Sequence, residues 1–203
     1  MTASPACPLP NVQLPPQPQA YLIIDDLEDG DNLTGRTGGL GGNWEIWDDD
    51  SAKPTASVSN TCAALGKYAM HLSTTGQTGW GASASVFFAA PPHPSPFNGS
   101  GWNAISFYMA LSPNDTRPRT FRASVSTMET AWNGRCTSCV DNFGTGVAVT
   151  GRWQRFVLPF ADLRQMGWGV PPASFKLDEI VQFHVALDQK FDVWIDHIQF
   201  ERL

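Results

Sequence analysis

The sequence has no long hydrophobic run and little charge. No stretch of about 18 apolar residues occurs, so we expect no membrane-spanning helix. Charged residues make up 16% of the 203 residues, and the net charge is −6 with a pI near 5.0. Nucleic acids and anionic membrane surfaces attract basic proteins, so this balance argues against either as a partner.

Several signatures of enzymes are also missing. The glycine-rich stretch 34–42 lacks both the GxGxxG order and a Walker lysine, and it precedes a predicted strand, which argues against a nucleotide site. There is no Gly-x-Ser-x-Gly, and the four histidines lack metal-ligand spacing. We expect a non-catalytic protein. The alternative is a small hydrolase or lyase that uses Glu129 or Asp141, since paired carboxylates can hydrolyse glycosides.

The first 20 residues contain six prolines and no charged residue. This composition is typical of an extended linker, so the folded domain is predicted to cover 21–203. A basic segment followed by an apolar one is absent, and we expect no signal peptide in these residues. Such a linker is found on modules of longer proteins and on mature exported chains.

The remaining chain consists of short segments in which polar and apolar residues alternate, separated by turn-forming residues. The predicted strands are 21–28, 43–48, 67–73, 81–88, 104–110, 120–126, 152–160, 178–187 and 191–200. About nine or ten short strands without a convincing long helix or an internal repeat predict an all-β sandwich.

The last predicted strand, 191–200, is apolar on most of both faces. Even alternation places Phe191, Val193 and Ile195 on one face, and Trp194 and Ile198 on the other. A strand of this kind belongs inside a sheet that is covered on both sides. The only similar segment is 21–28, so we expect the first and last strands to pair or to lie adjacent.

The four cysteines are Cys7, Cys62, Cys136 and Cys139, and they allow three pairings. The motif Cys136-Thr-Ser-Cys139 lacks the second ligand pair of a structural zinc site, and it lies in a loop rather than at the start of a redox helix. A short disulfide within this loop is the favoured interpretation, in an exported protein. Cys7 and Cys62 would then form the other pair.

Three of the predicted strands share one pattern, with an apolar face and a polar face. The polar faces of 104–110, 120–126 and 178–187 carry Tyr108, Arg122, Ser124, Gln182 and His184. Sugars need planar hydrogen-bond partners for their hydroxyls and an aromatic ring for their C–H faces, and this set supplies both. A plain solvated face is the alternative, but such faces usually carry lysine, glutamate and threonine.

Tryptophans at strand ends and in loops could form an aromatic rim beside such a face. Five of the eight tryptophans lie in these places: Trp44, Trp47, Trp102, Trp132 and Trp168. Because most tryptophans are largely buried whatever their role, about two of the five are expected to contact a ligand. Trp132 is the leading candidate, and Trp44 and Trp47 are the next candidates.

Segments 24–30 and 191–198 resemble the two ends of a jelly-roll family of carbohydrate-binding modules. The family includes the glucan-binding modules of family eleven and domains named after a mitochondrial complex I assembly factor, and it occurs on bacterial secreted enzymes and lipoproteins. Segments 79–82, 105–110, 136–144, 153–160 and 167–169 agree as well. The resemblance covers about residues 21–201 and implies a jelly roll of two antiparallel sheets. The sequence departs from the family at His197, usually acidic, and at Asn142, often histidine.

The resemblance also implies a structural calcium ion, with Glu28 and Asp196 as side-chain ligands. The residues themselves agree, because a hard cation takes six to eight oxygens and Asp26 and other acidic residues lie close by in the sequence. Carboxylates that converge without a nearby lysine need a compensating cation. Acidic turns that are merely solvated are the alternative.

Together these observations predict an extracellular or cell-envelope module that binds a polysaccharide, which we expect to be a β-glucan. The module would bring an attached catalytic domain or a cell surface to that polysaccharide. A structural or protein-binding domain of an envelope lipoprotein is a further alternative, besides the small enzyme described above.

Overall fold

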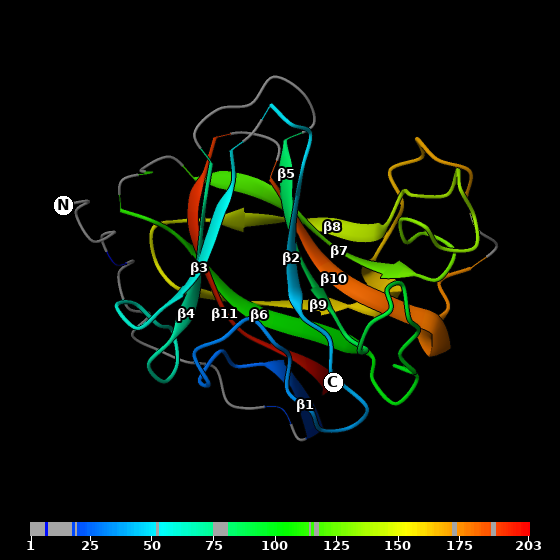
Figure 1. Cartoon of the computed structure of the whole chain (residues 1–203), viewed down its shortest axis with the longest axis horizontal. Coiled ribbons are helices and arrows are strands. Elements are labelled where there is room, and N and C mark those ends of the chain that lie inside the picture. The colour runs from blue at the N-terminus through cyan, green and yellow to red at the C-terminus, as the bar shows by residue number, and fades with distance from the viewer. Residues whose placement is uncertain are drawn as a thin grey trace.

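A computed structural model describes Cys7, Pro18 and residues 20–51, 53–74, 81–113, 115, 118–171, 174–187 and 190–203. Most of the predicted linker, residues 1–20, lies outside this part of the chain. The described part contains eleven strands and two single-turn 3-10 helices (Figure 1). None of its helices is long and apolar enough to span a membrane.

The strands follow one another along the chain with short connections. They are β1 (Ala20–Asp25), β2 (Trp44–Asp48), β3 (Thr55–Ser59), β4 (Ala69–Ser73), β5 (Ala82–Phe87), β6 (Ala104–Leu111), β7 (Arg119–Thr127), β8 (Phe143–Val149), β9 (Gln154–Pro159), β10 (Ile180–Leu187) and β11 (Asp192–Arg202). The 3-10 turns are η1 (Phe160–Asp162) and η2 (Leu177–Glu179).

The strands form two antiparallel sheets that pack face to face. The six-stranded sheet has the order β3-β4-β11-β6-β9, with β1 also pairing with β11. The five-stranded sheet has the order β2-β5-β10-β7-β8. The predicted all-β jelly-roll sandwich is therefore confirmed.

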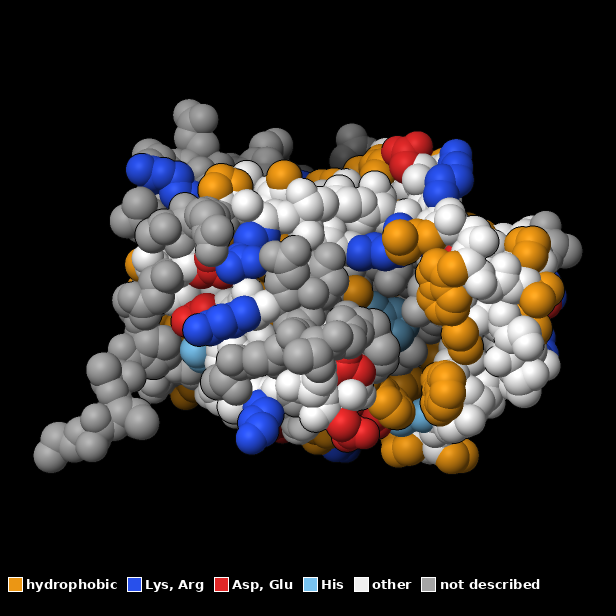
Figure 2. Space-filling model, turned by 90° about the horizontal axis from the view of Figure 1, so that it is seen from above, with side chains coloured by type: hydrophobic (Ala, Val, Ile, Leu, Met, Phe, Trp, Pro, Cys, Tyr) orange, Lys and Arg blue, Asp and Glu red, His pale blue; other side chains and the backbone are white. Residues whose placement is uncertain are grey.

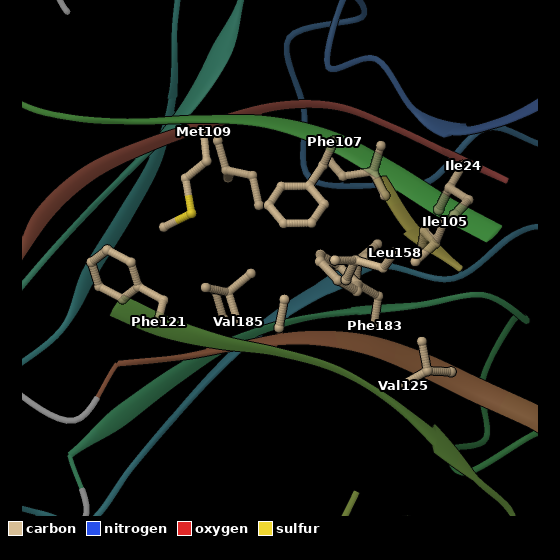
Figure 3. Close-up of a cluster of buried hydrophobic side chains, with 14 of the residues drawn as sticks. Ile24, Ile105, Phe107, Met109, Phe121, Val125, Leu158, Phe183 and Val185 are labelled. Carbon is tan, nitrogen blue, oxygen red and sulfur yellow. The ribbon is translucent and has the colours of Figure 1, made fainter. Parts of the chain in front are cut away.

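The core lies between the two sheets (Figure 3). Phe107 and Met109 point inward from β6 toward Phe121 of β7 and Phe183 of β10, and the rings of Phe107 and Phe183 lie 5.0 Å apart. Burying each such side chain stabilises the fold by about 1.5–3 kcal/mol. Because alternate residues of β7 and β10 fill this core, the residues between them face outward.

The first and last strands pair, as the sequence predicts, from Ala20 opposite Arg202 to Asp25 opposite Ile198. The expected even alternation along β11 is wrong after Asp196. The register shifts there, and His197 has a φ of 49°, so the strand contains a bulge. The bulge turns Ile198 to the same side as Ile195, and both belong to the core between the sheets.

The sequence patterns did not identify β3 and β8. In β8, Gly144 and Gly146 lie on the outer face, and glycine weakens any strand signal. Gly144 is required by packing, because a Cβ at this position would lie 2.5 Å from the Cβ of Ser124. Close packing against β7 therefore requires a glycine in β8, and this glycine weakens the sequence pattern by which a strand is predicted.

Candidate functional site

The outer face of the five-stranded sheet presents rows of side chains that run across the strands. One row consists of Glu45, Ser85, His184, Ser124 and Gly144. The row on one side of it consists of Trp47, Ser83, Ala186, Arg122 and Gly146. The row on the other side contains Phe87, Gln182 and Ser126. We call these three rows the floor.

Figure 2 shows one face of the molecule with a hollow in which a histidine side chain is visible, beside a group of hydrophobic side chains.

His184 lies at the centre of the floor and is neutral. Its Nδ1 lies 2.8 Å from Ser85 Oγ, and its Nε2 lies 3.3 Å from Asn142 Nδ2. Burial lowers the pKa of His184 to about 4. Because the Asn142 amide nitrogen can only donate, Nε2 accepts, and the ring proton is assigned to Nδ1, which donates to Ser85.

Three buried polar atoms around His184 have no hydrogen-bond partner. They are Ser126 Oγ, Gln182 Oε1 and Asn142 Oδ1. Ser126 and Gln182 lie directly opposite each other on β7 and β10. Native proteins leave few buried polar groups unpaired, and each costs about 1–3 kcal/mol. All three belong to the outer side of the five-stranded sheet, where Ser126 and Gln182 are themselves buried.

Arg122 and Ser124 also belong to the floor, as the sequence predicts. The Arg122 guanidinium donates to the carbonyl oxygens of Asn142 at 2.9 Å and Arg164 at 2.6 Å. Burial lowers the pKa of Arg122. These hydrogen bonds connect β7 to Asn142, just before β8, and to Arg164, which pairs with Gly144 of β8. Ser124 lies between His184 and Gly144 in the central row.

The predicted aromatic residues separate into two groups. Trp47 is 40% exposed at the β2 border of the floor, and Trp132 is 65% exposed in the loop between β7 and β8. Trp44 instead points into the core, 5% exposed, and its Nε1 donates to Asp25 Oδ2 at 2.6 Å. The expectation that Trp44 lies on the rim is therefore wrong, because its strand parity is that of Ile46 rather than Trp47.

Tyr108 does not share a face with the other predicted residues. It lies on β6, in the six-stranded sheet, and is buried in a cluster with Trp153 and Trp194. Alternation assigns a residue to one side of its own strand, but it does not assign the strand to a sheet. The structure thus brings together Arg122, Ser124, Gln182 and His184, and it separates Tyr108 from them.

The acidic residues of the enzyme alternative have structural partners. Asp141 is buried and accepts hydrogen bonds from the backbone N–H groups of Met166, Gly167 and Trp168 at 2.6–3.3 Å. Glu129 Oε1 forms an ion pair with Lys176 Nζ at 2.7 Å. Asp141 therefore fixes the loop that follows η1, next to the floor residue Asn142.

Site residues that the sequence interpretation missed are Ser85, Ser126 and Asn142. Ser85 and Ser126 have outward parity in strands that were predicted correctly, so parity alone could have included them. The sequence marks Asn142 only as a departure from the family pattern, which often has histidine there. Its contact with His184 joins a loop to a strand 42 residues away, which no local pattern predicts.

Two of the predicted metal ligands converge on the segment 62–68. Asp196 Oδ2 accepts from the N–H groups of Ala64 and Leu65 at 2.8 and 3.0 Å, and its Oδ1 is buried without a partner. Glu28 Oε1 accepts from the N–H groups of residues 67 and 68 at 2.7 and 2.9 Å. Burial raises the pKa of Asp196 to about 7, and the charge of Glu28 adds to this effect.

The third predicted ligand is placed differently. Asp26 Oδ1 accepts from the Glu28 N–H at 3.3 Å, and the described residues contain no group of three or more acidic, histidine or cysteine side chains placed to hold a metal. The unpaired oxygen of Asp196 fits a hard cation. The side-chain donors available for such an ion are Glu28 and Asp196.

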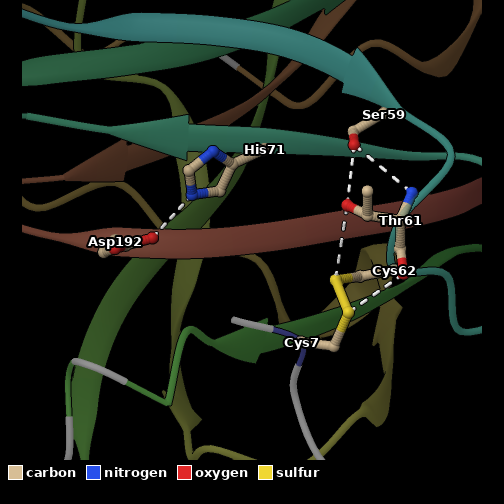
Figure 4. The surroundings of a disulfide bond; sticks show 6 residues. All are labelled: Cys7, Ser59, Thr61, Cys62, His71 and Asp192. Atoms are coloured by element: carbon tan, nitrogen blue, oxygen red, sulfur yellow. Dashed lines mark hydrogen bonds and ion pairs between the residues drawn. A yellow bond between two sulfur atoms is a disulfide. The ribbon is translucent and has the colours of Figure 1, made fainter. Parts of the chain in front are cut away.

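Both expected disulfides are present. Cys7 is bonded to Cys62 with a Cα–Cα distance of 5.3 Å, and Cys136 to Cys139 with a distance of 5.4 Å. Figure 4 shows that Cys62 follows the end of β3, with His71 of β4 and Asp192 of β11 nearby; His71 Nε2 and Asp192 Oδ1 lie 2.6 Å apart. The first disulfide attaches the N-terminal segment to the outer side of the six-stranded sheet.

Comparison with known proteins identifies similar folds but no sequence relatives. No protein-family model and no curated protein matches the chain. A family 11 carbohydrate-binding module from Clostridium thermocellum, solved in complex with a β-1,3-1,4-mixed-linked tetrasaccharide, superposes with a TM-score of 0.64 at 18% identity, covering 90% of this chain and 95% of that one. A family 30 module of the cellulosomal cellulase Cel9D-Cel44B from the same organism gives 0.58 at 14% identity, covering 90% and 98%. This chain therefore has the jelly-roll fold of family 11 and family 30 carbohydrate-binding modules.

Proposed function

We propose that the floor of the five-stranded sheet binds a polysaccharide without cleaving it, and that the polysaccharide is a β-glucan. The observation that carries this proposal is the set of unpaired polar atoms of Ser126, Gln182 and Asn142 on an outward face. A sugar chain presents hydroxyl donors and acceptors of the kind that these three atoms lack.

The shape and charge of the floor suit a neutral chain. The row that begins at Trp47 contains small residues, among them Ser83, Ala186 and Gly146. Trp47 offers a ring for the C–H face of a sugar. The neutral imidazole of His184 lies at the centre of the floor, with its ring proton on Nδ1. An extended sugar chain would therefore cross the strands from the β2 border toward β8.

The choice of a β-glucan rests on likeness of fold. The family 11 module above was solved with a β-1,3-1,4-mixed-linked tetrasaccharide. Disulfides are typical of oxidising compartments, which supports an extracellular or cell-envelope location. In such a location the module would hold an attached catalytic domain or a cell surface against its polysaccharide.

We also propose a structural calcium ion at Glu28 and Asp196. The ion would pair with the unpaired Oδ1 of Asp196 and compensate the two carboxylates that meet at segment 62–68. It would supply charge compensation and join β1, β11 and that segment. Gly66 supports the arrangement, because a Cβ there would lie 2.4 Å from the Glu28 carboxylate.

Affinity electrophoresis against soluble polysaccharides tests the proposed function. We expect mixed-linked β-glucan to retard the wild-type protein, and we expect Trp47→Ala to reduce this retardation. Tyr108→Phe is the matched control, because Tyr108 lies on the other sheet, and it should migrate like the wild type. No retardation of the wild type on any glycan would refute the proposal. Release of reducing ends from the same glycans would instead support the enzyme alternative.

A further inference from the structure

The exposed hydrophobic side chains of this domain are concentrated at one end. Of the eight large hydrophobic residues that are exposed in the described part of the chain, four lie on two loops: Trp132, Met166, Trp168 and Val170. Each is more than half exposed. Figure 1 shows the two loops together at the end of the sandwich beyond β7, β8 and β10. Clusters of exposed apolar residues mark interaction sites on soluble domains.

Both loops are held in place by hydrogen bonds. Asp141 binds three N–H groups of the loop that carries Trp168, and the Val170 N–H donates to the Ser138 carbonyl at 2.9 Å. In the other loop, the N–H groups of Gly134 and Arg135 donate to the carbonyls of Ala131 and Met128. Aromatic side chains on loops that are already fixed by hydrogen bonds lose little conformational entropy when they bind a ligand.

The loops border the floor directly. Ala131, next to Trp132, packs against Phe87 and Val181, and Phe87 is a floor residue. Asn142, next to Asp141, contacts His184, and Arg164 forms a bridge with Gly144 of β8. The loop of Trp168 therefore lies beside the outer edge of β8, and the loop of Trp132 lies at the end of the strands next to Phe87 and Val181, whereas Trp47 lies at the β2 border.

We propose that Trp132 and Trp168 form a second contact for the same sugar chain, so that the domain recognises a long polysaccharide rather than a short oligosaccharide. This inference rests on the proposed function. The floor is five strands wide, roughly 19 Å at the usual strand spacing. A short oligosaccharide is accommodated by the floor alone, and a polymer continues over its border onto the loop tryptophans.

Titration calorimetry with mixed-linked β-glucan polymer and with its tetrasaccharide tests this inference. Trp168→Ala and Trp132→Ala should each weaken polymer binding about three- to tenfold, the loss expected for one aromatic contact. Neither change should alter tetrasaccharide affinity. Tyr21→Ala is the matched control, because Tyr21 is an exposed aromatic residue on β1 of the other sheet.

Three results would overturn the inference. If both tryptophan variants bind the polymer like the wild type, the loops do not contact the chain. If they lose tetrasaccharide and polymer affinity equally, the loops belong to the floor and do not select chain length. Both results leave the proposed function standing. If the wild type binds neither ligand, the proposed function fails together with this inference.

Discussion

Ser126 on β7 lies directly opposite Gln182 on β10, and both the Ser126 hydroxyl and the Gln182 carbonyl oxygen are buried without a partner. Unpaired polar atoms in a protein interior weaken folding, so their removal should not destabilise the domain. We expect Ser126→Ala and Gln182→Met to leave the free energy of unfolding within about 0.5 kcal/mol of the wild type, or to raise it. Urea unfolding measures this, with Ser57→Ala on β3 as the control. A loss above about 2 kcal/mol would show that these atoms are paired in the protein.

His184 should make the domain less stable in mild acid. Its folded pKa, about 4, lies below the ordinary value of 6.5, so between these values the unfolded chain binds a proton that the folded protein does not. The stability of the wild type relative to His184→Gln should therefore be constant above pH 6.5. It should decrease below that pH by up to about 1 kcal/mol per pH unit, down to about pH 4. Urea unfolding of both proteins at pH 5.0 and pH 7.5 checks this, and a difference that does not change with pH would contradict it.

Asp25 should have the opposite effect. Burial raises its pKa from 3.8 to about 7, although the Leu27 N–H and the Trp44 indole donate to it. The folded protein then holds a proton that the unfolded chain releases, so this contribution is present below pH 3.8 and is lost as the pH rises to about 7. The stability of the wild type relative to Asp25→Asn should decrease over this range by up to about 1 kcal/mol per pH unit. Thermal unfolding at pH 5.0 and pH 8.0 measures it, and an increase with pH would refute the assignment.

Calcium should stabilise the domain through Glu28 and Asp196. At a concentration 100 times the dissociation constant, a bound ion contributes about 2.7 kcal/mol, which raises the Tm by about 5–10 °C for a chain of this length. Protons compete for Asp196, so the gain should be larger at pH 8 than at pH 6. Calorimetry with calcium chloride and with a chelator measures it. Glu28→Gln and Asp196→Asn should abolish the gain, and Asp162→Asn, exposed on η1, should keep it; an equal gain in all four proteins would contradict the site.

The sequence predicted the class of fold and nine of the strands because each has its own alternating pattern. It predicted the pairing of β1 with β11 because only these two segments are apolar on both faces. It could not predict the bulge at His197, which depends on a single left-handed residue, or β8, in which Gly144 makes room for Ser124.

The candidate site was predicted in part for similar reasons. Parity correctly placed Arg122, Ser124, Gln182 and His184 on an outward face. It misplaced Tyr108 and Trp44, because alternation is a property of one strand and the assignment of strands to sheets is a property of the whole fold. The contact of Asn142 with His184 depends on how a loop folds back over β10, which the local sequence does not encode.

The most direct test of the central claim is calorimetric titration of mixed-linked β-glucan into the wild type and into the Ser126→Ala/Gln182→Met double variant. We predict that the wild type binds and that the double variant binds at least tenfold more weakly with an undiminished Tm. Equal binding by the two proteins would contradict the account, as would a wild type that binds no polysaccharide.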